Sequence, residues 1–89
     1  MMKLTDKQKE MIINFGAFHY APEKMALIID LPIAEIIKEI KNKKSEFYRL
    51  YMEGKSKADY LIDKKLFELA KAGDLKALEE FEYRKKTKK

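Results

Sequence analysis

The sequence contains no cysteine and no tryptophan, and its 89 residues include only three glycines, two prolines and one histidine. The absence of cysteine excludes disulfide bonds and thiolate metal sites. The single histidine, His19, has no partner at metal-ligand spacing, so we expect no metal site. The three glycines stand apart, which excludes a glycine-rich phosphate loop. The sequence therefore predicts a protein without metal or cofactor.

Long apolar runs are also absent. The longest purely apolar stretch, Met25–Ile29, is far shorter than the ~18 residues of a membrane span. The first residues, Met1–Lys7, contain charges and lack the apolar segment of a signal peptide. We expect a cytoplasmic protein with no membrane contact. A domain this small has a thin core, and without disulfides or metals the remaining route to extra stability is oligomerisation.

Catalytic constellations are missing as well. Ser45 and Ser56 have no nearby base, and the carboxylates stand at helical spacing to lysines, as on a solvated helix face. We interpret the chain as a binding protein and not as an enzyme.

The positive charge is concentrated at the C-terminal end. Of the net charge of +5, residues 1–44 contribute +2, residues 45–83 contribute −2 and residues 84–89 contribute +5. The segment 84–89 is too short and too charged to fold alone, so we expect a disordered tail. The tail either binds an anionic surface, for which nucleic acid is the first candidate, or only increases solubility.

Apolar residues recur at helical spacing and no alternating segment is present, which predicts an all-α fold. Thr5 and Gln8 form a capping box for a helix that begins at Asp6 and ends near Phe15. Pro22 and Pro32 each open a further short helix. The first 44 residues therefore form a three-helix unit.

A second helical region follows the polar break at residues 42–45. Ser45 is a suitable N-cap for a long helix over residues 46–72, which is either continuous or kinked at Gly54. Gly73 marks a turn, and Asp74 can cap a short last helix. We expect three parts: a three-helix unit over 1–44, a helical oligomerisation region over 45–83, and the basic tail over 84–89.

Residues 22–41 have the plan of a DNA-binding helix-turn-helix, in which the second helix presents its outer face to a major groove. Asp30 stands where such turns usually have glycine. The ordinary alternative is two packed helices of a bundle. Under the helix-turn-helix interpretation, we expect the DNA-binding residues to be Lys24, Lys38, Lys41, Asn42, Lys43 and Lys44, with Arg84, Lys85 and Lys86 from the tail.

Three aromatic residues of the long helix, Tyr48, Tyr60 and Phe67, lie off its apolar stripe and need a second surface to cover them. That surface is either another subunit or the first three helices.

The order of these parts resembles the terminase small subunits of tailed bacteriophages and prophages. The resemblance rests on the segment Tyr20–Ile29 at the start of the helix-turn-helix, on Gly54-Lys55, and on an Ala-x-x-Gly-Asp-x-x-Ala turn over Ala70–Ala77. It implies a non-catalytic protein of the bacterial host cell that binds viral double-stranded DNA, assembles as a ring and binds the terminase large subunit. Oligomer contacts would then fall on the long helix, at Phe47, Tyr48, Tyr51, Tyr60 and Phe67.

Two other functions stay open. The same motif fits a small transcriptional regulator, for which a two-fold dimer is expected, and the acidic residues Glu35 and Glu39 fit a helical adaptor that binds protein.

Overall fold

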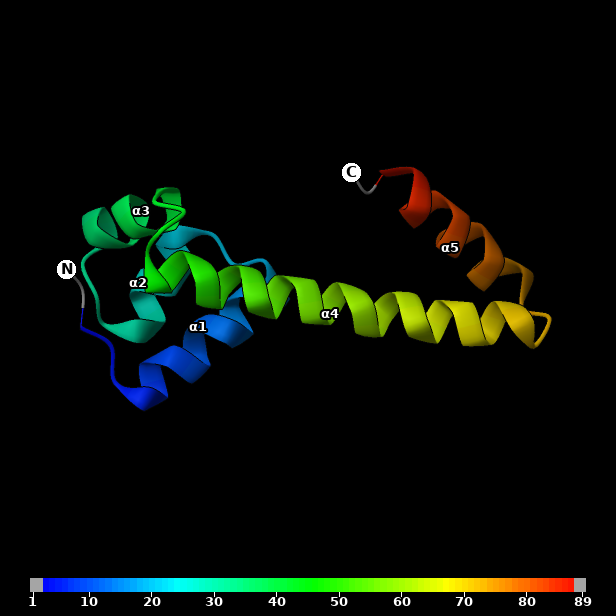
Figure 1. Ribbon diagram of the computed structural model, residues 1–89, viewed down its shortest axis with the longest axis horizontal. Coiled ribbons are helices and arrows are strands. Elements are labelled where there is room, and N and C mark those ends of the chain that lie inside the picture. The colour runs from blue at the N-terminus through cyan, green and yellow to red at the C-terminus, as the bar shows by residue number, and fades with distance from the viewer. Residues whose placement is uncertain (1–2, 88–89) are drawn as a thin grey trace. The chain divides into compact units, whose positions relative to one another are not determined.

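Within residues 3–87, which the computed structural model describes, the chain forms five helices and no strand. The predicted all-α class is therefore confirmed. The chain divides into two compact units, and the boundary lies between Lys57 and Ala58. In chain order the helices are α1 (Asp6–Phe18), α2 (Pro22–Ile29), α3 (Ile33–Lys41), α4 (Glu46–Lys71) and α5 (Leu75–Thr87) (Figure 1).

The predicted boundary at residues 44 and 45 differs from the boundary that the structure shows. The polar break before Ser45 lies inside the first unit, because the first turns of α4 supply part of that unit's core. Phe47 and Leu50 of α4 are buried there together with residues of α1, α2 and α3. The division falls instead within α4, which runs from one unit into the next.

The helix ends of the first unit follow from local chemistry. Thr5 and Gln8 form the predicted capping box, with the Gln8 N–H donating to Thr5 Oγ1 at 3.1 Å and the Thr5 N–H donating to Gln8 Oε1 at 2.9 Å. His19 ends α1 in the left-handed region, with φ 57°. Asp30 ends α2 in the same region, with φ 59°, which short polar residues enter more easily than most.

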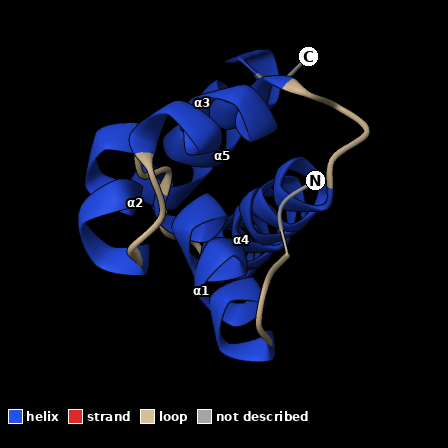
Figure 2. Ribbon diagram, turned by 90° about the vertical axis from the view of Figure 1, so that its left-hand side faces the viewer, coloured by secondary structure: helices blue, strands red, loops and turns tan. Residues whose placement is uncertain are grey.

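The core of the first unit is a single cluster at the start of α4. Figures 1 and 2 both show α1, α2 and α3 gathered around the first turns of that helix. Phe18 is exposed at the end of α1, outside this cluster. The buried members of the cluster are Ile12, Phe15, Met25, Ile29, Ile36, Phe47 and Leu50.

Two glycines let α1 and α4 approach closely. A Cβ atom at Gly16 would lie 1.8 Å from the Tyr51 carbonyl oxygen, and one at Gly54 would lie 1.7 Å from the Ile13 carbonyl oxygen. Gly54 is thus a packing position within one continuous helix, and the kink considered there is not confirmed. Gly16 likewise lies inside α1, which continues past the predicted end near Phe15 to Phe18.

The second unit is a helical hairpin made by residues 58–71 of α4 and by α5. Gly73 turns the chain with φ 101°, and the Asp74 carboxylate accepts a hydrogen bond from the Ala77 N–H at 3.0 Å, as the sequence predicts. Residues 84–87 belong to α5, so the prediction of a disordered tail is wrong for them. Lys88 and Lys89, also assigned to that tail, lie outside the described residues.

Candidate nucleic-acid interface

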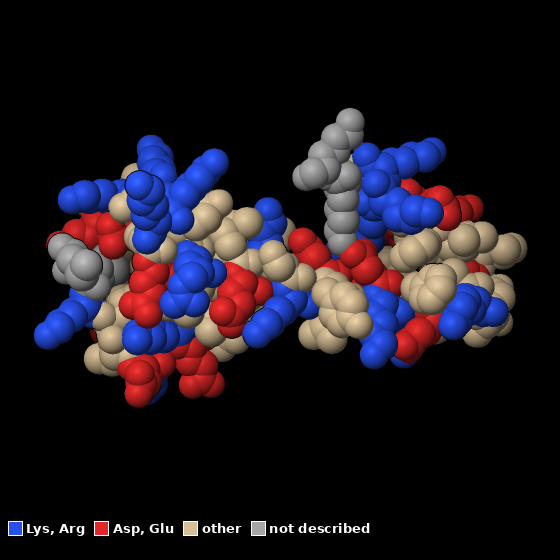
Figure 3. Space-filling view, in the orientation of Figure 1, with Lys and Arg blue, Asp and Glu red and all other residues tan. Residues whose placement is uncertain are grey.

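Lysine side chains gather where α3 ends and the chain turns into α4. Lys38 and Lys41 are exposed on the last turns of α3, and Lys43 and Lys44 are exposed in the connection that follows. Figure 3 shows basic side chains projecting together from this part of the molecule, at the upper left over α3. We call these four lysines the α3–α4 corner. The structure therefore brings together four of the predicted DNA-binding residues.

The corner is built on a specific network of hydrogen bonds. The Ser45 hydroxyl donates to the Glu39 carbonyl oxygen at 2.7 Å and accepts from the Tyr48 N–H at 3.0 Å, so one side chain joins the end of α3 to the start of α4. The Asn42 side-chain oxygen accepts from the Lys44 N–H at 3.0 Å. This bond uses one of the two lone pairs of the Asn42 side-chain oxygen, so the amide NH₂ and the other lone pair are left to meet a nucleic acid.

Of the acidic groups near the corner, Glu46 is the one that has ion pairs among the described residues. Glu46, in the first turn of α4, is paired with Lys9 at 3.3 Å and with Arg49 at 3.5 Å. Two such pairs reduce the repulsion that this carboxylate would exert on a phosphate. Glu35 on α3 is exposed and has no ion pair among the described residues, so this acid does oppose dense phosphate contact.

Two surface depressions flank the start of α4, and each includes residues of the corner. Arg49, an exposed residue that lines one of these depressions, was not predicted from the sequence, because a charged residue on a helix is usually only solvated. The first has a volume of about 430 Å³ and is lined by Lys43, Lys44, Ser45, Glu46, Tyr48, Arg49 and Met52. The second has a volume of about 520 Å³ and is lined by Leu4, Lys38, Glu39, Asn42, Lys44, Ser45, Glu46 and Phe47.

Lys24 also belongs to the predicted DNA-binding set, and it lies on α2 and not at the corner. Its Nζ atom is 4.4 Å from the centre of the Tyr20 ring, a cation–π contact that leaves the ammonium exposed.

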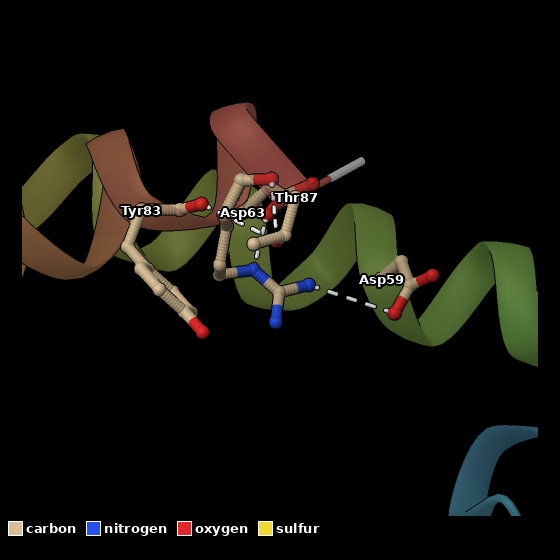
Figure 4. A network of polar contacts seen from close by, with 5 residues as sticks. Asp59, Asp63, Tyr83 and Thr87 are labelled. Carbon is tan, nitrogen blue, oxygen red and sulfur yellow. Dashed lines mark hydrogen bonds and ion pairs between the residues drawn. The ribbon is translucent and has the colours of Figure 1, made fainter. Parts of the chain in front are cut away.

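Arg84 has a different role from the one expected of a basic tail. Its Nε donates to Asp63 Oδ1 at 2.6 Å, and its terminal nitrogen lies 3.5 Å from Asp59 Oδ1 (Figure 4). The side chain is only 25% exposed. Arg84 therefore joins α5 to α4 and is not a free contact for DNA. Lys85 lies against the Phe81 ring and pairs with Glu82, and Lys86 is exposed.

The predicted oligomer interface separates into two groups. Phe47 is 1% exposed in the core, and the Tyr51 hydroxyl donates to the Tyr20 carbonyl oxygen at 3.0 Å, so both residues pack within the first unit. Burial raises the pKa of the Tyr51 phenol. Tyr48 is half-buried, whereas Tyr60 and Phe67 are exposed on the hairpin.

Residues 3–87 contain no cluster of three or more His, Cys, Asp or Glu side chains that could hold a metal ion. His19 is exposed at the end of α1 and acts there as a helix cap. None of the helices in this range is long and apolar enough to span a membrane.

Comparisons of the chain with protein families, with curated proteins and with solved structures find no match. The case for a function therefore depends on the chain's own residues.

Proposed function

We propose that this chain is a non-catalytic protein that binds double-stranded DNA and self-associates. The observation that carries the proposal is the α3–α4 corner, where four exposed lysines stand on a helix end that the core and Ser45 hold in place. Clustered cations on a rigid edge attract a polyanion, and release of its counterions favours binding.

The interpretation of α2 and α3 as a helix-turn-helix supports this proposal. Met25 and Ile29 of α2 pack with Ile36 of α3 in the buried cluster, so one helix braces the other. The opposite face of α3 exposes Ala34, Glu35 and Lys38. In such motifs this outer face enters the major groove, and basic residues at its edge contact phosphates.

The same face predicts weak sequence selectivity. Asparagine and glutamine can read adenine and arginine can read guanine through paired hydrogen bonds, and none of the three residue types lies within α3, where Lys38 and Lys41 are the residues that could reach a guanine edge. The lysines of the corner contact phosphates, which carry no base information. Affinity is therefore expected to depend more on salt than on sequence.

The resemblance to terminase small subunits supports a particular form of this function. In that form, the chain marks viral DNA for packaging, assembles as a ring in the bacterial host cell and binds the large subunit. The exposed Tyr60 and Phe67 of the hairpin, both predicted as interface residues, support the self-association that such a ring requires. A transcriptional regulator would share the DNA contact but would form a two-fold dimer.

A second candidate function is that of a protein-binding adaptor. Leu27 of α2 is 85% exposed, and Phe18 at the end of α1 is 60% exposed. Large apolar side chains at the surface of a small unit favour a protein partner over DNA.

Charge reversal at the corner tests the DNA-binding proposal. The double variant Lys38→Glu and Lys41→Glu should weaken binding to a duplex by at least tenfold at ~100 mM salt, because it removes phosphate contacts and adds repulsion. Fluorescence anisotropy of a labelled duplex measures this loss.

The matched control is Lys65→Glu with Lys76→Glu, which changes net charge equally at exposed lysines of the hairpin. This control should bind nearly as well as the unmodified chain. Equal losses in both variants would show that net charge alone governs binding, and no loss in either would refute the corner as the interface.

A further inference from the structure

Glu46 places a negative charge among the cations at the start of α4. It lies in the first turn of that helix and lines both depressions beside the α3–α4 corner. Lys43, Lys44 and Arg49 line the first of these depressions, so three cations share it with the Glu46 carboxylate. A phosphate that enters this depression therefore meets an acid as well as the cations.

Two cations are paired with this carboxylate, and both pairs are loose. A terminal nitrogen of Arg49, one turn further along α4, lies 3.5 Å from Glu46 Oε2, and Lys9 Nζ of α1 lies 3.3 Å from the same oxygen. Both distances exceed the ~2.7–2.9 Å of a charge-assisted hydrogen bond. The Arg49 side chain is 62% exposed, and water weakens an ion pair at such a site. Another anion can therefore take the place of the carboxylate beside Arg49.

We infer that Glu46 is an internal competitor of DNA at the corner: its carboxylate holds Arg49, and Arg49 contacts a phosphate only when that phosphate replaces the carboxylate. This inference rests on the DNA binding proposed above and adds a control of its strength. The four lysines of the corner have no ion pair within residues 3–87, so they are available to phosphates without such an exchange.

Glu35 provides the comparison that separates competition from simple repulsion. It is exposed on α3 and has no ion pair in the described part of the chain, so it opposes a phosphate by repulsion alone. Glu46 repels a phosphate and also occupies a cation that would otherwise bind it. Neutralising Glu35 therefore removes one effect, and neutralising Glu46 removes two.

The two acids give a matched pair of variants, Glu46→Gln and Glu35→Gln, each made with Arg49 and with Arg49→Gln. Each loses one negative charge and keeps the shape of the side chain, and fluorescence anisotropy of a labelled duplex measures affinity. With Arg49 present, Glu46→Gln should tighten binding by about three- to fivefold, because repulsion is lost and Arg49 is released. With Arg49→Gln, this gain should fall below about twofold. The gain from Glu35→Gln should be the same in both backgrounds, since Glu35 and Arg49 are not paired.

The outcomes separate this inference from the proposed function. Thermal unfolding of Glu46→Gln should stay close to that of the unmodified chain, since the lost pairs are exposed, and this shows that the variant is folded. If the unmodified chain does not bind the duplex at ~50 mM salt, the proposed function fails and the inference fails with it. If it binds but Glu46→Gln does not tighten binding, or tightens it equally without Arg49, the inference is overturned and the proposed function stands.

Discussion

Single residues decide how closely the helices of the first unit approach. Gly16 and Gly54 each lie under a backbone carbonyl of the neighbouring helix, with no room for a methyl group. The sequence pattern suggested a helix end near Phe15, next to Gly16, and a kink at Gly54, because glycine is usual at both. It contains no information on which helix lies against each glycine, so the packing role was not predictable.

Substitution of either glycine by alanine should destabilise the fold. Helix propensity alone favours alanine by ~1 kcal/mol, but the added Cβ would lie less than 2 Å from a carbonyl oxygen. We expect Gly16→Ala or Gly54→Ala to lower the free energy of unfolding by ~3 kcal/mol or more, since backbone must shift to relieve the overlap. Thermal unfolding measures the change.

The control for these variants is Ser56→Ala, at an exposed position two residues further along α4. It should leave stability unchanged or slightly higher. A stabilising effect of Gly54→Ala would contradict the close approach of α1 and α4.

Aromatic and basic residues show the same limit of sequence reasoning at the residue scale. Phe47 and Tyr51 were assigned to an oligomer interface, but their partners come from α1, α2 and the segment between them. Arg84 was assigned to DNA, but two carboxylates about twenty residues earlier hold it. In each case the deciding partner is distant in sequence and becomes a neighbour only through the fold.

At the scale of the helices, the starts and ends were largely predictable, because capping depends on neighbours in sequence. Thr5, Pro22 and Asp74 mark helix starts as expected. The grouping of the four lysines of the corner was also predictable, since they follow each other along α3 and its connection to α4. The division within α4 was not predictable, because one continuous helix serves two units.

Ser45 joins two helices, and its removal should cost more than the loss of an ordinary cap. Ser45→Ala removes the acceptor for the Tyr48 N–H and the donor to the Glu39 carbonyl. We expect a loss of ~2 kcal/mol in the free energy of unfolding, of which ~1 kcal/mol is the cap and the rest the second hydrogen bond. Chemical denaturation measures it.

The comparison for Ser45 is Thr5→Ala, which removes only a local and exposed cap at the start of α1. It should cost ~1 kcal/mol or less. Equal losses in the two variants would contradict the joining role of Ser45.

At the scale of the whole chain, the two units differ in burial. Residues 1–57 hold the buried cluster and the lysine corner, and they carry eleven basic and eight acidic side chains. Residues 58–89 carry nine basic and seven acidic side chains, and most of the large apolar side chains among residues 58–87 are exposed. This division favours DNA binding by the first unit and self-association by the second.

The salt dependence of affinity for duplex DNA is the most direct test of the proposed function. Each phosphate contact adds about −0.9 to the slope of log affinity against log salt. With Lys38, Lys41, Lys43, Lys44 and Arg49 at the interface, we expect a slope between about −3 and −5 for each bound copy. Absence of binding at ~50 mM salt, or an affinity that does not change with salt, would contradict the account.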